Sequence, residues 1–317
     1  MTPRRFLTAA AIGVVLLAIA AGGLPNAAAP AGMLAELIGG VRPSYGPARV
    51  SRVPNEQAIV RRFWAPGLDA GYDPQGLAAA PGAVFVSAYR SEVFGVNRGP
   101  CRLFRLNPGG GHEMGHAEIP APCGHAGGIA YPGGAMLYLA DTHALFEIYL
   151  RQAFGEQALP IRAIPLGPGL VGALATSTPG AVWSGTYRED GPGRLYRFSG
   201  EVLSGLPAGA TLRVADASAE IAIPSYAQGA AFDSAGKLWV ASSHNRWGEI
   251  ARLDPASGAV ERRYAVSAGI EGIAFDEGGL LWAVSEAGAR HFYENFFAGL
   301  VIPFFPLVFA IDPKLLE

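Results

Sequence analysis

Apolar and polar positions along this chain repeat five times in the same order. Each repeat opens with a small residue, an aliphatic residue and an alanine or near equivalent, at 74–78, 127–130, 172–175, 228–232 and 271–275. After a turn rich in Gly or Pro, each repeat continues with an aromatic or β-branched run: AVFVSAY (83–89), MLYLADT (136–142), AVWSGTY (181–187), KLWVASS (237–243) and LLWAVSE (280–286). Such runs, bounded by turn residues, predict β-strands.

A third run follows in every repeat, and a more polar fourth run, such as VERRYAV (260–266), closes most of them. The third runs are CRLFRLNP (101–108), ALFEIYL (144–150), GRLYRFS (193–199), EIARLDP (249–255) and PLVFAIDP (306–313). No helical periodicity lies between the units. Four-stranded units that recur about every 40 to 55 residues predict an all-β fold, a β-propeller whose blades bury their faces against neighbouring blades.

The last repeat ends at Glu317 without a fourth run. The segment AIVRRFWA (58–65) precedes the first repeat and has the pattern of the missing strand. We therefore expect the N- and C-terminal strands to close the ring within one blade, so that residues 58–317 form five blades. Residues 31–57 are either a linker or a degenerate sixth blade.

Residues 1–30 have the layout of an export signal. Arg4 and Arg5 precede an apolar run from 6 to 21, and small residues follow at 27–29. The segment is a cleavable signal peptide or an uncleaved N-terminal membrane anchor. The expected location is therefore secreted or periplasmic, with anchoring at the N-terminus as the alternative.

The composition fits one large globular domain. The chain has 317 residues, of which 43 are Gly, 25 are Pro and 16% are charged, and half are hydrophobic, which excludes a disordered chain. The formal net charge of −2 gives no sign of a nucleic acid partner.

The only two cysteines, Cys101 and Cys123, belong to loops that open on one face of the propeller, in adjacent blades. An exported protein can keep a disulfide. We predict that the two residues are bridged, with Cα atoms within about 7 Å of each other.

The stretch HEMGH (112–116) matches the H-E-x-x-H signature of zinc hydrolases, which requires both histidines on one face of a helix. Three glycines precede it, Gly115 lies inside it and Pro120 follows, so the sequence does not favour a helix. We interpret it as a turn leading into the outer strand of the first blade, and we do not expect a zinc metalloprotease.

Two stretches resemble a known group of propellers. The segment AQGAAFDSAGKLWVASSHNRWGEIARLDPASGAVERRY (227–264) is similar to the calcium-dependent gluconolactonase/SMP-30 superfamily of six-bladed propellers. The segment IEGIAFDEGGLLWAVSE (270–286) resembles that group and also the NHL and phytase-like propellers. Asp233 and Asp276 in these phrases are interpreted as turn residues.

The resemblance implies a divalent cation, held by a Glu, an Asn and an Asp where inner strands begin at the channel. The corresponding positions here are Gln75, Gly127, Gly172, Gln228 and Glu271. Only Glu271 is charged, so the metal set of the superfamily is not reproduced. Asp141, at the end of a second strand, is a weaker second carboxylate for calcium, and a turn with Thr142 and His143 is its alternative role.

Loops before the first strand and after the second strand of each blade open on the same face. That face should gather these side chains: Asp73, His125, Asp141, His143, Tyr187, His244, Arg246, Glu286 and His291. The candidate catalytic residues are His125 and Glu271. The candidate binding residues are Gln75, Asp141, Gln228, His244 and Glu286. The alternative for each is an ordinary solvated loop residue.

Two functions remain open at this point. One is an exported hydrolase of lactones or esters, in which a cation polarises a carbonyl and a histidine activates water. The other is a non-catalytic propeller that binds a small molecule or an extracellular partner on the channel-opening face.

The apolar stretch 294–309 has three alternative roles: a lid over the channel, a membrane-facing patch or an insertion packed on its own blade. The segments that would associate with a membrane are the N-terminus and 294–306.

Overall fold

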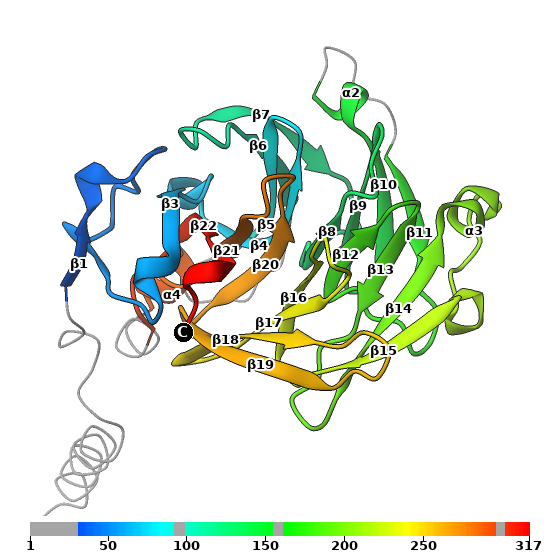
Figure 1. Cartoon of the computed structure of the whole chain (residues 1–317). Helices are drawn as coiled ribbons and strands as arrows, with labels where there is room; N and C mark the ends of the chain where they lie inside the picture. The colour runs from blue at the N-terminus through cyan, green and yellow to red at the C-terminus, as the bar shows by residue number, and fades with distance from the viewer. Residues whose placement is uncertain (1–30, 92–98, 155–160, 296–301) are drawn as a thin grey trace, which may run out of the picture.

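The computed structural model describes residues 31–91, 99–154, 161–295 and 302–317, and within them five four-stranded antiparallel sheets. Figure 1 shows these sheets as the blades of a propeller, with the first strand of each toward the centre. The predicted five-bladed all-β propeller is therefore confirmed. The predicted signal peptide or membrane anchor, residues 1–30, lies outside the described residues. Among those described, no helix is long and apolar enough to cross a membrane.

Blades one to four each use four consecutive strands. Blade one contains β4 (Tyr72–Ala80), β5 (Ala83–Arg90), β6 (Cys101–Leu106) and β7 (Glu113–Ile119). Blade two contains β8 (Gly128–Ala130), β9 (Met136–Asp141), β10 (Ala144–Tyr149) and β11 (Arg162–Pro165). Blade three contains β12 (Leu174–Thr178), β13 (Ala181–Gly185), β14 (Gly193–Ser199) and β15 (Ala219–Ile223). Blade four contains β16 (Ala227–Phe232), β17 (Leu238–His244), β18 (Trp247–Leu253) and β19 (Val260–Val266).

Blade five closes the ring. It contains β20 (Ile270–Phe275), β21 (Leu281–Ser285), β22 (Leu307–Ile311) and, as its outer strand, β3 (Ile59–Trp64). β3 and β22 pair antiparallel, with Leu307 opposite Trp64. The predicted closure of the ring by N- and C-terminal strands is confirmed. Side chains from β3 fill the interior of this blade, where Trp64 and Phe63 are almost fully buried.

Small residues set how closely the blades approach at the axis. A Cβ atom added to Gly128 would lie 2.0 Å from the Ala175 nitrogen of the next inner strand. One added to Gly272 would lie 2.2 Å from the Leu77 nitrogen, across the junction of blades five and one. Because neighbouring backbones touch at these points, larger residues would force the inner strands apart. We call this level of the channel the waist.

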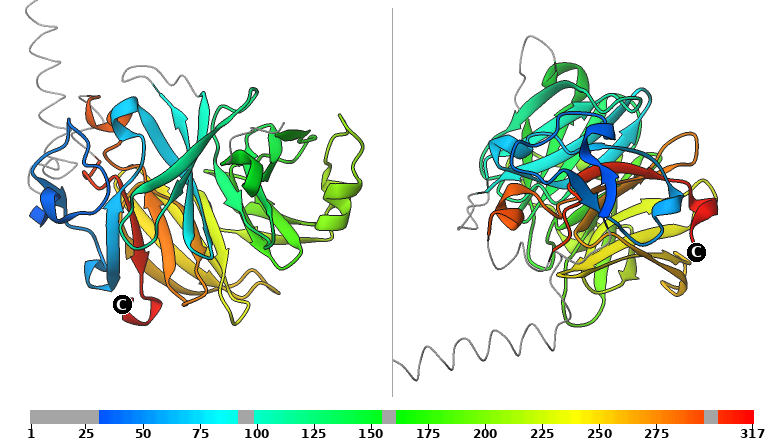
Figure 2. Two further views of the ribbon diagram at one scale, coloured as in Figure 1. Left: turned by 90° about the horizontal axis from the view of Figure 1, so that it is seen from above. Right: turned by 90° about the vertical axis from the view of Figure 1, so that its left-hand side faces the viewer.

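Residues 31–58 form an arm outside the five sheets, with β1 (Ala31–Leu34) paired to β2 (Arg49–Ser51). The arm does not form a four-stranded blade. It packs on blade five, where Ser51 N donates to Phe304 O at 2.9 Å. Figure 2 shows the arm at one side of the ring and helix α3 (Gly200–Gly205) at the other.

The remaining helices are short and lie in connections. They are α2 (Leu150–Ala153), α4 (Arg290–Tyr293) and the 3-10 turns η2 (Ala35–Leu37), η3 (Glu56–Ala58), η4 (Leu68–Ala70), η5 (Val214–Asp216) and η6 (Pro313–Leu315). The HEMGH stretch enters strand β7 rather than a helix, as predicted. Within it, the His116 ring and the Glu113 carboxylate pair with each other, with Nδ1 and Oε1 2.6 Å apart.

The apolar stretch 294–309 is described in part. Phe304 and Phe305 are buried, and the Phe304 ring contacts Tyr45, Trp64 and Tyr293. This described part packs against its own blade and the arm, which was one of the three alternatives. Residues 296–301 lie outside the described residues, so membrane association through 294–306 stays a prediction.

Candidate active site at the channel mouth

Three of the five inner strands begin with an irregular register. β4 shifts between Pro74 and Leu77, β16 between Ala227 and Gly229, and β20 between Ile270 and Ile273. The polar channel-opening residues Gln75, Gln228 and Glu271 fall inside these three interruptions. A bulge redirects a side chain that regular pleating would place in the sheet, and bulges are common beside active sites. The bulges thus explain locally why polar residues stand among apolar strand residues here.

The junction of blades five and one gathers four polar side chains, which we call the channel mouth: Asp73, Gln75, Glu271 and Glu286. Gln75 Nε2 donates to Glu286 Oε2 at 2.8 Å and to the Pro74 carbonyl at 3.0 Å. The sequence predicted Gln75, Glu271 and Glu286 as site residues and placed Asp73 on the same channel-opening face. The structure brings these four residues together.

Burial and like charge dominate the electrostatics of the mouth. Burial raises the pKa of Glu271 well above its usual value, and the neighbouring Glu286 carboxylate raises it further. Burial, followed by Glu286, raises the pKa of Asp73 to about 8, although Tyr89, opposite Asp73 in the β4–β5 pair, lowers it in part. Because Glu286 acts on both carboxyls, the three groups share one electrostatic environment.

Several oxygens of the mouth lack a hydrogen-bond donor among the described residues. They are both carboxyl oxygens of Asp73 and Oε1 of Glu271. Asp73 is 0% exposed and Glu271 is 2% exposed. The approach of Tyr89 to Asp73 therefore falls outside hydrogen-bond geometry for either oxygen. Unpaired buried carboxyl oxygens are costly, which marks this place as one where a ligand can supply donors.

Tyrosines border the carboxyls. Tyr45, from the arm, is close enough to Asp73 for that carboxylate to raise its pKa, after the larger effect of burial. Tyr187, from blade three, has its pKa raised to about 12, chiefly by burial and by Glu189, with a smaller contribution from Glu271. The mouth thus combines acidic groups with aromatic side chains from the arm and from two blades.

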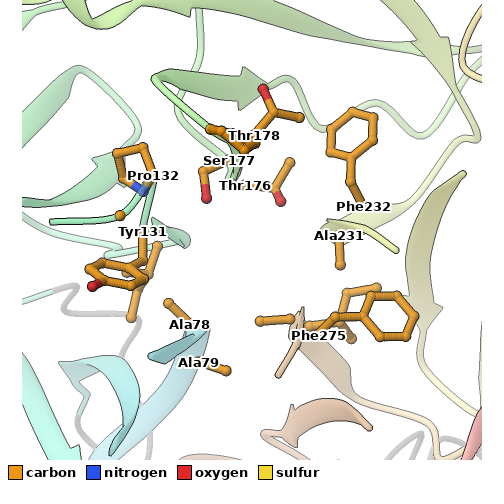
Figure 3. A pocket seen from close by; sticks show the side chains of 15 residues that line it. Ala78, Ala79, Tyr131, Pro132, Thr176, Ser177, Thr178, Ala231, Phe232 and Phe275 are labelled. Carbon is orange, nitrogen blue, oxygen red and sulfur yellow. The ribbon is translucent and has the colours of Figure 1, made fainter. Parts of the chain in front are cut away.

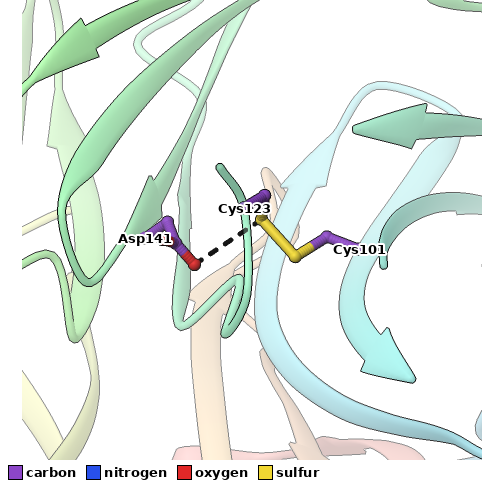
Figure 4. A group of neighbouring side chains, drawn as sticks. All are labelled: Cys101, Cys123 and Asp141. Atoms are coloured by element: carbon purple, nitrogen blue, oxygen red, sulfur yellow. Dashed lines mark hydrogen bonds between the residues drawn. A yellow bond between two sulfur atoms is a disulfide. The ribbon is translucent and has the colours of Figure 1, made fainter. Parts of the chain in front are cut away.

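Asp141 makes backbone contacts that the sequence did not predict. Its Oδ1 accepts hydrogen bonds from three consecutive backbone nitrogens, those of Gly124 (3.1 Å), His125 (2.6 Å) and Ala126 (2.9 Å). The same oxygen lies 3.5 Å from Cys123 Sγ, a contact drawn as a dashed line in Figure 4. Asp141 thereby holds the loop before β8 in place. These contacts are neither those of a metal ligand nor those of a turn with Thr142 and His143. Metal binding by Asp141 stays a prediction.

The predicted disulfide joins Cys101 to Cys123, with Cα atoms 5.9 Å apart. The bridge links the start of β6 to the loop before β8 and so ties blade one to blade two (Figure 4). It fixes the same loop that Asp141 holds. His125 lies in that loop, with its ring 5.7 Å from the ring of Tyr89.

The other predicted binding residues lie in blade four. The His244 ring packs 4.7 Å from that of Tyr226, and Asn245 Nδ2 lies 2.7 Å from His244 Nε2. Gln228 is half-buried at the start of β16. The contacts described for these side chains do not include the carboxyls of the mouth, so their part in a site remains predicted.

The donor chemistry of the mouth suits a hard cation, because carboxylate and amide oxygens are the ligands calcium prefers. The spacing suits it less well. Among the described residues, the one group of three or more acidic, histidine or cysteine ligands within 4.8 Å of one another is Cys101, Cys123 and Asp141, and its two sulfurs are bonded together. The ligand oxygens of Asp73, Glu271 and Glu286 do not all lie within 4.8 Å of one another. Calcium binding at the mouth stays a prediction.

The opposite end of the channel contains a cavity of about 280 Å³, where the five inner strands end. We call it the exit cavity. Figure 3 shows its side chains, mostly alanines and hydroxyl residues with aromatic groups at the edge: Ala78, Ala79, Tyr131, Pro132, Thr176, Ser177, Thr178, Ala231, Phe232 and Phe275. Its lining includes no carboxylate, imidazole or basic side chain. It can bind a small molecule but offers little for acid–base chemistry.

These features define a five-bladed propeller with an acidic channel mouth. Among solved structures it is similar to glutaminyl cyclase from Myxococcus xanthus, with a TM-score of 0.51 and 15% identity over 80% of this chain and 94% of that one. It is also similar to PQQ-bound aldose sugar dehydrogenase from Streptomyces coelicolor, with a TM-score of 0.43 and 20% identity over 76% of this chain and 79% of that one. A third is virginiamycin B lyase from Staphylococcus aureus, with a TM-score of 0.37 and 16% identity over 71% and 67%.

No protein-family model and no curated protein sequence matches the chain. At these identities the likeness to solved structures shows the fold, and the gluconolactonase resemblance is not shown at the level of a family. Function must therefore be argued from the chain's own residues.

Sequence reasoning overlooked two tyrosines that border the mouth, Tyr45 and Tyr89. Tyr45 comes from the arm, outside the repeats, so no periodic signal could select it. Tyr89 ends the second strand of blade one, the position that selected Glu286 in blade five, and the same rule applied to aromatic residues would have found it.

Proposed function

We propose that the protein is an exported hydrolase of lactones or esters that acts at the channel mouth. The observation that carries the proposal is the meeting of three carboxyl groups at the blade five–blade one junction, two of them buried with raised pKa values. Groups whose pKa values are shifted by burial and by a neighbouring charge are typical of acid–base catalysis. The leader sequence and the disulfide support export.

The three carboxyls would divide the proton transfers of hydrolysis. Asp73, with its pKa of about 8, is mostly protonated near neutral pH and can donate to the leaving oxygen. Glu286, oriented by the 2.8 Å bond from Gln75, accepts a proton from the attacking water. Water adds to the carbonyl carbon, and the bond from that carbon to the leaving oxygen breaks. An ester gives one acid and one alcohol, and a lactone gives one hydroxy acid.

Glu271 keeps the pair in unequal protonation states. Its carboxyl is buried beside Glu286, and like charges at close range disfavour simultaneous ionisation. The proposal includes no step through a divalent cation, because the three carboxyls do not form a group of ligand oxygens within 4.8 Å of one another. His125, predicted from the sequence as a catalytic residue, lies in the loop that Asp141 holds, and in this proposal it binds substrate beside Tyr89.

The second candidate function is ligand binding without catalysis. The unpaired oxygens of Asp73 and Glu271 favour it, because a bound ligand would satisfy them whether or not chemistry follows. An activity measurement with a matched acidic variant separates the two functions.

The test is a screen of five- and six-membered lactones and aryl esters with the purified protein, before and after treatment with a chelator. We expect hydrolysis that survives chelation and falls at least tenfold in Glu286→Gln. The control is Glu261→Gln, an exposed carboxylate paired with Lys237 and Arg252 on blade four, which should keep full activity. Absence of turnover on every substrate, or full activity in Glu286→Gln, contradicts the proposed hydrolase.

A further inference from the structure

We infer that the channel mouth binds the protonated primary amine of its ligand, so that the ligand is an organic ammonium compound. The binding statement depends on the geometry of the mouth alone. Its extension to the substrate, an ester or lactone that carries an amino group, rests on the proposed function. In that complex the ammonium replaces the proton of Asp73, so Glu286 takes a proton from the attacking water and then passes it to the leaving oxygen.

The first argument is the number of buried hydrogen-bond acceptors that lack a donor. Both oxygens of Asp73 and one of Glu271 lack donors among the described residues, at sites that are 0% and 2% exposed. The Gln75 amide nitrogen already donates to Pro74 and Glu286, so its hydrogens are in use. A primary ammonium brings three N–H donors on one atom, which matches the need.

The second argument is charge. Among the residues that the structure describes, neither a lysine nor an arginine contributes to the pKa shift of Asp73 or of Glu271. Carboxyls buried together without a basic partner are stabilised by any cation that enters. The neighbouring tyrosines favour an organic cation, since aromatic rings attract ammonium groups.

The third argument is spacing. An ammonium nitrogen lies about 2.8 Å from each carboxylate oxygen, whereas calcium lies about 2.4 Å from its ligands. An ammonium group can therefore bridge oxygens that lie about 0.8 Å farther apart than the oxygens that calcium can bridge. The failure of the mouth to gather a compact metal set is thus consistent with this ligand.

The pKa of Asp73 gives the proposal a pH signature. Asp73 faces Glu286, Tyr89 and Tyr45, and Glu271 faces Glu286 and Tyr187. Because Asp73 is largely protonated below about pH 8, a cation that binds there must displace a proton. Affinity for an ammonium ligand should therefore rise with pH up to about 8, while an alkyl ammonium itself stays charged.

The binding experiment is calorimetric titration with 2-phenylethylammonium and with 2-phenylethanol, at pH 6.5 and 8.5, in two buffers of different ionisation enthalpy. We expect the ammonium to bind at least tenfold more tightly than the alcohol, with proton release at pH 6.5. Asp73→Asn and Glu271→Gln should remove most of this preference, while Glu261→Gln keeps it. Circular dichroism verifies that each variant is folded.

Equal binding of ammonium and alcohol, an unchanged preference in both variants, or calcium binding with no ammonium binding would overturn the inference. A pair of substrates separates it from the proposed function: an amino acid aryl ester and its N-acetyl derivative. If neither is cleaved but the ammonium still binds, the hydrolase fails and the ligand class stands. If both are cleaved at the same rate, the hydrolase stands and the amine preference fails.

Discussion

The two ends of the channel differ in chemistry although the same five strands form both. At the mouth, where the strands begin, three register shifts coincide with polar residues, and buried carboxyls meet. At the exit cavity, where the strands end, the lining consists of alanines, hydroxyl groups and aromatic rings. Repeated strands thus supply a common frame, and local irregularity at one end supplies the reactive groups.

The volume of a cavity does not identify the reactive site of this protein. The exit cavity has a measurable volume of about 280 Å³ but no group able to exchange a proton near neutral pH. The mouth has orphaned carboxyl oxygens and shifted pKa values. Chemistry is therefore expected at the mouth, and the exit cavity is expected to matter for packing or passive binding.

The largest effect is expected at the waist that separates the two ends. Gly128→Ala would place a Cβ 2.0 Å from the Ala175 nitrogen, a contact that only a shift of the inner strands can relieve. We expect a loss of more than about 3 kcal/mol in the free energy of unfolding, measured by thermal denaturation.

The matched control is Gly205→Ala in α3, where an added Cβ meets nothing within 4 Å. This variant should be as stable as the wild type or slightly more stable. A Gly128→Ala protein that melts within two or three degrees of the wild type would show that the blades are not in close contact at the waist.

The next effect contrasts the two ends directly. Glu271→Gln keeps the size of the side chain but removes one of the three carboxyl groups of the mouth. Thr176→Val removes a hydroxyl group at the exit cavity. We expect hydrolysis to fall about 100-fold in Glu271→Gln, which corresponds to about 2.7 kcal/mol, and by less than about twofold in Thr176→Val. Initial rates on the best substrate of the screen measure both, and equal losses would remove the functional distinction between the ends.

The sequence predicted the frame better than the site. Strand runs, blade count, closure by 58–65 and the disulfide all depend on local pattern or on repeat register, which a single chain displays. Gln75, Glu271 and Glu286 could be selected because the register places them at the channel.

Two features of the site depend on contacts that the repeats do not encode. The hydrogen bonds of Asp141 could not be predicted from the sequence. They depend on the path of the loop 123–126, which places three backbone nitrogens against this carboxylate. Tyr45 reaches the mouth from an arm without repeat register. The exit cavity gave no signal, since alanine, serine and threonine occur everywhere in such a chain.

The smallest effect tests the electrostatics of the mouth through stability. The pKa of Asp73 is 3.8 in the unfolded chain and about 8 in the folded protein, so the folded protein binds more protons than the unfolded chain between about pH 4 and pH 8. Stability contributed by this group therefore falls as pH rises through that window. Asp73→Asn cannot ionise, and it should become more stable relative to the wild type as pH rises, by at least about 1 kcal/mol between pH 5 and pH 8.

Urea denaturation at both pH values measures this difference. Thr176→Val, at the exit cavity, should differ from the wild type by the same amount at pH 5 and pH 8, because threonine does not titrate. The gain in stability of Asp73→Asn with rising pH is specific to the mouth, because burial and the Glu286 charge both oppose ionisation of Asp73 in the wild type. A constant difference between Asp73→Asn and the wild type would mean that Asp73 ionises freely in the folded protein. The acid–base contrast between the two ends would then rest on Glu271 alone, whose pKa burial raises.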